Sequence, residues 1–169
     1  VYLDARRGFV AASGAKEQPV WSFKAPGTVV PAPAAADLDG DGEPDVVACV
    51  NADPTSWLVA ISGRDQRVLW QEAYESRAFP YMVGNPCLLL SDVTSDGTCD
   101  AVVVDEKNRL RVHDGKTGKT VWSRTGKDLV PVIGAQELDA GKHGRALLCR
   151  SLKAYCLLLI RNCSEVADP

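Results

Sequence analysis

The sequence predicts an all-β fold, a partial β-propeller of about three four-stranded antiparallel blades, because two patterns recur along its 169 residues. One pattern is an acidic loop followed directly by an apolar run. The other is Gly-x6-Trp, which occurs three times at spacings of 49 and 52 residues. Together they define a unit of four short strands in about 45–55 residues, which is typical of a propeller blade. Because a propeller closes with about 4–8 blades, we expect a fragment of a larger propeller.

The two patterns also place the blades. We expect a single domain over 1–169, with the end of one blade at 1–25, blades at 29–74 and 85–124, and an incomplete blade at 129–169. The strand that returns after each glycine carries a tryptophan, namely Trp21, Trp70 and Trp122. One large ring per unit can pack against the neighbouring unit. The connection 71–85 is long and precedes Pro86, so we expect an exposed loop suited to binding.

The first acidic loop, residues 37–45, reads Asp-Leu-Asp-Gly-Asp-Gly-Glu-Pro-Asp. Carboxylates this crowded repel one another unless a cation joins them, and calcium takes roughly six to eight oxygen ligands. The expected calcium ligands are Asp37, Asp39, Asp41 and Asp45, with the backbone carbonyl of Glu43. A helix-loop-helix calcium site would need Glu at the twelfth position, which is Ala48, and the β-branched run that follows favours a strand. The alternative is an acidic surface turn that binds nothing.

The same loop recurs with fewer carboxylates at 92–100. Its expected ligands are Asp92, Thr94, Asp96, Thr98 and Asp100, with threonine at the third position in place of aspartate. We expect weaker calcium binding here, and a vestigial loop is the alternative. A third copy at 137–145 has Gly141 and Arg145 at the fifth and ninth positions, so we expect it to have lost its metal.

Six cysteines occur without the C-x-x-C spacing of zinc sites, which favours disulfides, although the sequence leaves the pairing open. A short hairpin would place Cys149 opposite Cys156. Buried free thiols are the alternative for Cys49 and Cys149. The sequon Asn162-Cys163-Ser164 predicts glycosylation at Asn162 and agrees with an oxidising compartment outside the cytosol.

The charge pattern argues against two kinds of partner. The net charge is −3 with both signs interspersed, so no basic stripe favours nucleic acid and no polybasic patch favours a membrane surface. No apolar run approaches the roughly 20 residues of a membrane span. The chain begins with Val1 rather than Met, so we expect a fragment or a processed product.

The motifs resemble known families. Residues 29–50 and 85–104, with the loop DLDGDGEPDVV, resemble the FG-GAP repeat of integrin alpha subunits. The stretch VHDGKTGKTVW resembles the tryptophan-docking repeat of quinoprotein propellers. A mixture of both is similar to the single-pass membrane proteins called family with sequence similarity 234. That resemblance implies an extracellular or secretory-lumen propeller at the cell surface, on a membrane-anchored parent.

Two functions follow as expectations. The first is a non-catalytic, calcium-stabilised module that binds a protein partner the sequence does not identify. The alternative is a fragment of a quinoprotein-type dehydrogenase that uses a quinone and calcium. Against an enzyme, we expect His113 and His143 to be solvated, with no nucleophile at useful spacing, and no two cysteines are adjacent in sequence.

Overall fold

The computed structural model describes residues 2–4, 8–12, 19–30, 32–80, 87–125, 138–139, 145–150, 155–161 and 164–165, with side chains in 21–30, 32–80 and 87–125. Within these residues every regular element is a strand and there is no helix. The chain leaves the first acidic loop as a strand that begins at Asp45, as predicted. The all-β prediction is therefore confirmed.

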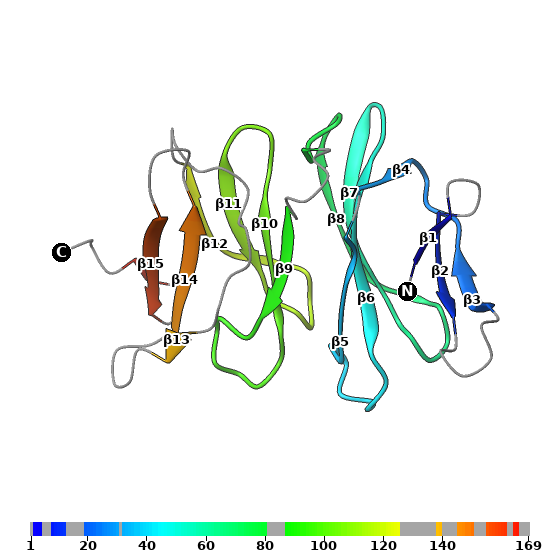
Figure 1. The fold of residues 1–169 in the computed structure, drawn as a ribbon, viewed down its shortest axis with the longest axis horizontal. Helices are drawn as coiled ribbons and strands as arrows, with labels where there is room; N and C mark the ends of the chain where they lie inside the picture. The colour runs from blue at the N-terminus through cyan, green and yellow to red at the C-terminus, as the bar shows by residue number, and fades with distance from the viewer. Residues whose placement is uncertain are drawn as a thin grey trace.

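The strands form four antiparallel sheets that stand side by side in chain order (Figure 1). The first sheet contains β1 (Tyr2–Asp4), β2 (Gly8–Ala12) and β3 (Pro19–Phe23). The second contains β4 (Thr28–Val29), β5 (Ala34–Ala36), β6 (Asp45–Asn51), β7 (Thr55–Ile61) and β8 (Val68–Glu75). The third contains β9 (Leu88–Ser91), β10 (Asp100–Val104), β11 (Arg109–His113) and β12 (Thr120–Thr125). The fourth contains β13 (Leu138–Asp139), β14 (Arg145–Arg150), β15 (Tyr155–Arg161) and β16 (Ser164–Glu165).

The run after the first acidic loop is buried on both faces, because β6 lies inside the second sheet between two neighbouring sheets. Successive side chains of a strand point to opposite faces. Val47 and Cys49 accordingly belong to one core cluster, whereas Val46, Ala48 and Val50 belong to another. The first cluster includes residues of the third sheet, and the second includes Trp21 of the first sheet. A continuous apolar run is thus what a strand between two sheets requires.

The segment before the first acidic loop forms two short strands rather than one. Its first part, β4, pairs with Asn51 and Val50, and its second part, β5, pairs with β6 from Asp45 to Val47. Between them Ala32 adopts a φ of 69°, and proline at position 33 has no N–H to donate to a sheet. Directly after β4, Val30 N donates to Cys49 O at 2.8 Å and continues the pairing with β6.

Each of the first three sheets has a β-bulge at the same place, just before the glycine of Gly-x6-Trp. The register shifts between Ala11 and Ala12, between Ala60 and Ile61, and between Val112 and His113. A bulge adds a residue to one strand and re-aims the next side chain. In each case the extra residue stands on the returning strand, directly before the tryptophan, at Val20, Leu69 and Val121.

The tryptophan of the second sheet docks on the third sheet, as the repeat predicts. Trp70 Nε1 donates to Gly115 O at 2.7 Å. The ring also lies on Gly118, where an added Cβ would come within 2.7 Å of Trp70 Cδ2 and Cε3. The hydrogen bond fixes the orientation of the indole and the glycine lets it approach the backbone. The two recurring residues of Gly-x6-Trp therefore meet across neighbouring units.

The connection predicted as an exposed binding loop is largely part of the fold, which corrects that expectation. Residues 71–75 continue β8, and Ala78 and Phe79 are buried. The side chain of Asn51 brackets this segment: Nδ2 donates to Phe79 O at 2.7 Å, and Oδ1 accepts from Phe79 N at 3.0 Å. These two bonds imitate a strand pair and hold Phe79 in the core. Residues 81–86 lie outside the described residues.

In the fourth sheet, Cys149 pairs directly with Cys156 in the register of β14 and β15, as the predicted hairpin requires. The sequence analysis expects an incomplete blade here. The described backbone contains four strands, of which β13 and β16 are two residues long.

Candidate functional site

The first acidic loop brings three carboxylates together between β5 and β6. One oxygen from each of Asp37, Asp39 and Asp45 lies within 4.8 Å of the others. Oxygens that share one calcium ion at about 2.3–2.6 Å must lie within about 5 Å of one another. Three of the four predicted carboxylate ligands therefore already meet the distance condition for a common cation.

Backbone N–H groups shape this loop. Asp37 accepts from Gly40 N at 2.7 Å and from Gly42 N at 3.0 Å. Asp41 accepts from the N–H of Glu43, the exposed seventh-position residue, at 2.8 Å. Gly40 and Gly42 have φ values of 79° and 86°, a region in which side chains other than glycine are strained. The two glycines thus allow the backbone dihedral angles that turn the loop carboxylates inward.

Asp45 ties the loop to the turn that follows β7. Its Oδ2 accepts from Leu38 N at 2.8 Å and from Asp39 N at 3.3 Å, and its Oδ1 accepts from Gly63 N at 3.0 Å. Asp45 is fully buried. An added Cβ on Gly63 would lie 2.1 Å from Pro44 O, so glycine is needed for this approach. The acidic loop and Gly-x6-Trp recur together because the carboxylate of one binds the glycine of the other.

Two arginines from the same turn face the loop, and the sequence analysis missed both. Arg64 Nε lies 3.0 Å from Asp41 Oδ2, and Arg67 Nη2 lies 2.9 Å from Asp39 Oδ2. Their side chains are 57% and 58% exposed, so each pair is worth about 0–1 kcal/mol. Asp41, the remaining predicted ligand, thus turns toward Arg64. The sequence does offer a signal for them, because Arg64 and Arg67 follow Gly63, the glycine of Gly-x6-Trp, by one and four residues.

The second loop repeats these bonds. Asp100 accepts from Val93 N and Thr94 N at 2.8 Å each, and from Gly115 N at 3.2 Å. Burial raises the pKa of Asp100, and the N–H groups that donate to it act in the opposite direction. Asp92 accepts from Asp96 N at 3.1 Å.

The second loop gathers its carboxylates less closely. Lys116 Nζ lies 2.9 Å from Asp96 Oδ2 and is the main cause of the lowered pKa of Asp96. Thr98, at the seventh position, donates its N–H to Asp96 at 2.8 Å. Among the described residues, the trio of the first loop has no counterpart here. This difference agrees with the expectation that the second loop binds calcium more weakly than the first.

Thr94 supplies an oxygen that lacks a partner. Its Oγ1 is buried and makes no hydrogen bond within the described residues. The Asp100 carboxylate lies near it, but their geometry is not that of a hydrogen bond. Buried polar oxygens without a partner are rare and point to a water or an ion. This is the atom that the sequence predicts as the third-position ligand.

The other predicted positions fall largely outside the described residues. Of the third loop, the structure describes Leu138 and Asp139 in β13 and Arg145 at the start of β14. His143 and Asn162 lie outside the described residues.

His113 is buried rather than solvated, which corrects the sequence prediction. It is 1% exposed, because it lies on the face of β11 that is turned toward Tyr74 of the second sheet. Its Nδ1 lies 2.9 Å from Gly118 O, which can only accept, so Nδ1 carries the proton. Its Nε2 then accepts from Tyr74 Oη at 2.6 Å. This histidine joins the second and third sheets.

The neutral form of His113 is favoured in the fold. Burial lowers its pKa from the usual 6.5, and the cation of Arg111 acts in the same direction. The carbonyl of Gly118 and the charge of Glu72 act in the opposite direction. Burial also raises the pKa of Tyr74, so the hydroxyl keeps its proton and can donate to Nε2.

The free energy of unfolding should therefore fall as the pH drops through 6.5, the usual pKa of histidine. The unfolded chain binds a proton there, whereas folded His113 binds one only at lower pH, so this stability is fully present above 6.5. The slope is at most about 1.4 kcal/mol per pH unit. Urea unfolding between about pH 7.5 and 5.5 measures it. His113→Gln should flatten the profile and His143→Gln should not; an equal slope in His113→Gln would contradict this assignment.

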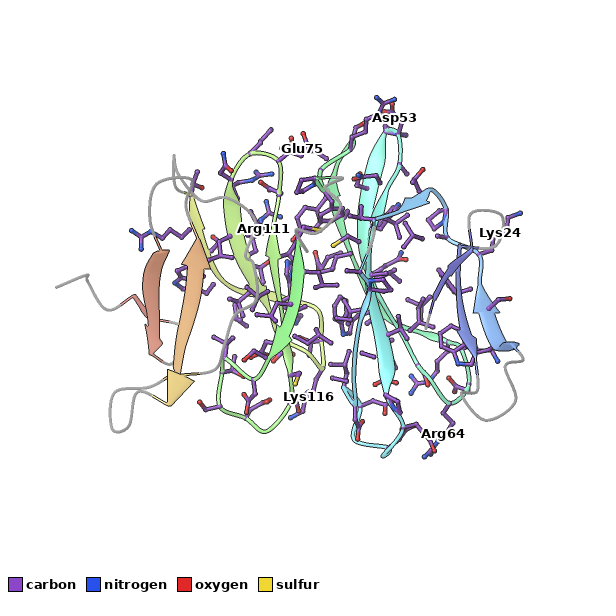
Figure 2. All side chains as sticks on the ribbon, viewed as in Figure 1. Lys24, Asp53, Arg64, Glu75, Arg111 and Lys116 are labelled. Atoms are coloured by element: carbon purple, nitrogen blue, oxygen red, sulfur yellow. The ribbon has the colours of Figure 1, made fainter. Side chains whose placement is uncertain are left out.

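A shallow hollow lies at the other end of the sheets from the acidic loops. Its volume is about 580 Å³, and its lining includes Asp53, Arg77 and Phe79. Asp53 lies at the upper end of the molecule, whereas Arg64 and Lys116, which face the two acidic loops, lie at the lower end (Figure 2). The candidate calcium loops are thus separate from this hollow.

Comparison with known proteins supports the fold. No family model matches the sequence. No curated protein matches it either. The chain is similar in structure to BamB from Moraxella catarrhalis, with a TM-score of 0.53 and 16% identity over 85% of this chain and 38% of the BamB chain. At this identity the likeness concerns the fold alone, and it confirms the predicted partial β-propeller.

Proposed function

We propose that this chain is a non-catalytic, calcium-stabilised β-propeller ectodomain that serves as a protein-interaction module. The convergence of Asp37, Asp39 and Asp45 on one point carries the proposal. Calcium would lie between these carboxylates and draw the loop before β6 onto the turn after β7. In the second loop, the unpartnered Thr94 Oγ1 supports a similar but weaker site.

The stabilisation expected from calcium is larger than that expected from the arginine ion pairs. The two exposed ion pairs contribute about 0–1 kcal/mol each. Calcium at about 100 times its Kd would stabilise the fold by about 2.7 kcal/mol per site. The arginines therefore reduce the calcium affinity of the first loop without closing it to the ion. In the calcium-free state they limit the repulsion among the carboxylates.

We place the parent protein at a membrane, with this propeller on the extracellular or secretory-lumen side. The resemblance to FG-GAP repeats and to family with sequence similarity 234 supports this placement, as do the sequon at Asn162 and the six cysteines. Within the described residues no helix is long and apolar enough to cross a membrane.

The quinoprotein alternative has one observation in its favour, the docking of Trp70 on Gly115. That contact lies between sheets and is structural. His113, the histidine that the structure describes, is buried and bonded to Tyr74 and Gly118. We therefore favour a binding module over an enzyme.

The visible absorbance and the melting of the purified chain distinguish the two functions. If the chain is a calcium-stabilised module, it should carry no quinone chromophore. Its melting temperature should then be higher in calcium than in chelator. Magnesium at the same concentration is the control, because its smaller octahedral shell fits such loops less well. A bound chromophore would favour the dehydrogenase. A melting temperature unchanged by calcium would remove the structural role of the ion.

Arg67→Ala should raise the calcium affinity of the first loop by about two- to fivefold, since it removes a cation that competes for Asp39. Calcium titration of the variant and the unmodified chain measures the ratio. Arg77→Ala is the matched control, because Arg77 pairs with Asp53 rather than with a loop carboxylate. Equal affinities in Arg67→Ala and the unmodified chain would mean that Arg67 does not compete with the ion.

A further inference from the structure

Two buried cysteines meet between the second and third sheets. Cys49 lies on β6, and Cys87 directly precedes β9. Each is 2% exposed, and both belong to the core cluster that joins these sheets. Both are free thiols in the structure, and they lie near each other, since a hydrogen bond with the Cys49 thiol is the main cause of the lowered pKa of Cys87. Residues far apart in the sequence thus bring two sulfur atoms together inside the protein.

The backbone holds both cysteines in place. Cys49 O accepts from Val30 N at 2.8 Å, and Cys87 O accepts from Val104 N at 3.0 Å. Each cysteine is therefore fixed to its own sheet by a hydrogen bond to a neighbouring segment. A contact between their side chains is therefore part of the packing between the two sheets.

The surroundings favour a sulfur–sulfur bond over a metal site. The buried cluster that contains the pair includes Leu58, Phe79 and Tyr74. A structural zinc site needs about four ligands. In the part of the chain that the structure describes, the one group of three or more metal-ligating side chains is the acidic trio of the first loop. Two thiols alone are the ligands of neither zinc nor calcium.

We propose that Cys49 and Cys87 form a disulfide that links the second and third sheets. The bond rests on the proposed placement outside the cytosol, which supplies the oxidant. The two thiols together lose two protons and two electrons as the S–S bond forms. A protein-disulfide oxidant accepts them, and its own disulfide is reduced to two thiols. Because the folded protein buries both sulfurs, the exchange takes place during folding, before the sheets close.

This bond would act across the interface that Trp70 and His113 also bridge. It closes the segment between positions 49 and 87 and restricts the unfolded chain accordingly. Reduction should then lower the melting temperature by about 10 °C. Cys99, which is half-buried in the second acidic loop, lies outside the pair and serves as the control.

Peptide mapping of the whole chain, secreted from eukaryotic cells, tests the pairing directly. Free thiols are first alkylated at acidic pH, and the protein is then cleaved without reduction after Lys and Arg and before Asp. Cleavage before Asp92 separates Cys87 from Cys99. The expected product joins peptide 45–52 to peptide 78–91. Alkylated Cys49 and Cys87, or a bond from Cys49 to any other cysteine, would overturn the proposal.

Melting of variants gives a second measurement that needs no cleavage. In the double variant Cys49→Ala/Cys87→Ala, reductant should no longer produce the shift of about 10 °C, whereas Cys99→Ala should keep it. A full shift in the double variant would also overturn the proposal. The calcium-dependent shift should persist in the double variant. Free thiols combined with a normal calcium shift would therefore reject the disulfide and leave the proposed function standing.

Discussion

Gly115→Ala should lower the free energy of unfolding by about 3–5 kcal/mol. A Cβ at this position would lie 1.9 Å from Cys99 O and 2.9 Å from its carbonyl carbon. These are backbone atoms, so the turn has to move away from the second loop. That movement weakens the bond from Gly115 N to Asp100 and the bond from Trp70 Nε1 to Gly115 O. One methyl group thus disturbs a blade and its neighbour together.

Denaturant unfolding of Gly115→Ala and a matched variant measures this effect. The control is Gly97→Ala, in the second acidic loop, whose Cys99 lies against Gly115. Gly97 has a φ of 88°, and an added Cβ would meet nothing within 4 Å. Its replacement should cost about 1–2 kcal/mol, the strain of alanine in a left-handed conformation. An equal loss in the two variants would mean that the Gly115 contact does not hold the sheets together.

Asp41→Ala should remove most of the calcium-dependent rise in melting temperature, and Asp96→Ala should remove less. Near 100-fold over Kd each calcium contributes about 2.7 kcal/mol, which corresponds to about 5–10 °C for a chain of this size. The first loop offers four carboxylates and the second offers three with a hydroxyl. Affinity in such sites follows ligand charge and rigidity, so the first loop should fill at lower calcium.

The two substitutions are well matched. Asp41 faces Arg64 at 3.0 Å, and Asp96 faces Lys116 at 2.9 Å. Each variant therefore loses one carboxylate and one exposed ion pair, and solvent screens both pairs. Melting in chelator measures that common loss, and the difference in calcium isolates the ion. Equal losses of the calcium shift would contradict the ranking of the loops.

Most of the strand framework could be predicted from the sequence, because local patterns determine it. The apolar runs after Asp45 and Asp100 form β6 and β10, and Trp70 docks on the next unit as the repeat implies. Period-two alternation, turn chemistry and one large ring per unit are all local features. These local features are found again in the folded protein, because each blade repeats the same contacts.

Residues whose burial depends on long-range partners could not be placed correctly from the sequence. His113 lies at a strand end, and its burial depends on Tyr74, which precedes it by 39 residues. Phe79 follows a strand and precedes proline, yet the side chain of Asn51 holds it in the core. A polar side chain that imitates a strand pair cannot be recognised before its partner is known.

The site could be predicted only in part, because some of its contacts are local and others come from distant parts of the chain. The ligand types and their spacing in the first loop are local, and Asp37, Asp39 and Asp45 converge. Arg64 and Arg67 reach that loop from a turn more than twenty residues later in the chain. Their effect on the loop depends on the bond from Gly63 N to Asp45, which brings the turn beside the loop. That bond exists only in the folded blade.

Calorimetric titration of the calcium-free chain with calcium tests the central claim most directly. The account predicts a tight binding event that disappears in Asp41→Ala and a weaker one that disappears in Asp96→Ala, with magnesium producing neither. Absence of binding heat at millimolar calcium, together with equal melting temperatures in calcium and in chelator, would show that the acidic loops are held by their own N–H bonds and arginine pairs, and would contradict a calcium-stabilised propeller.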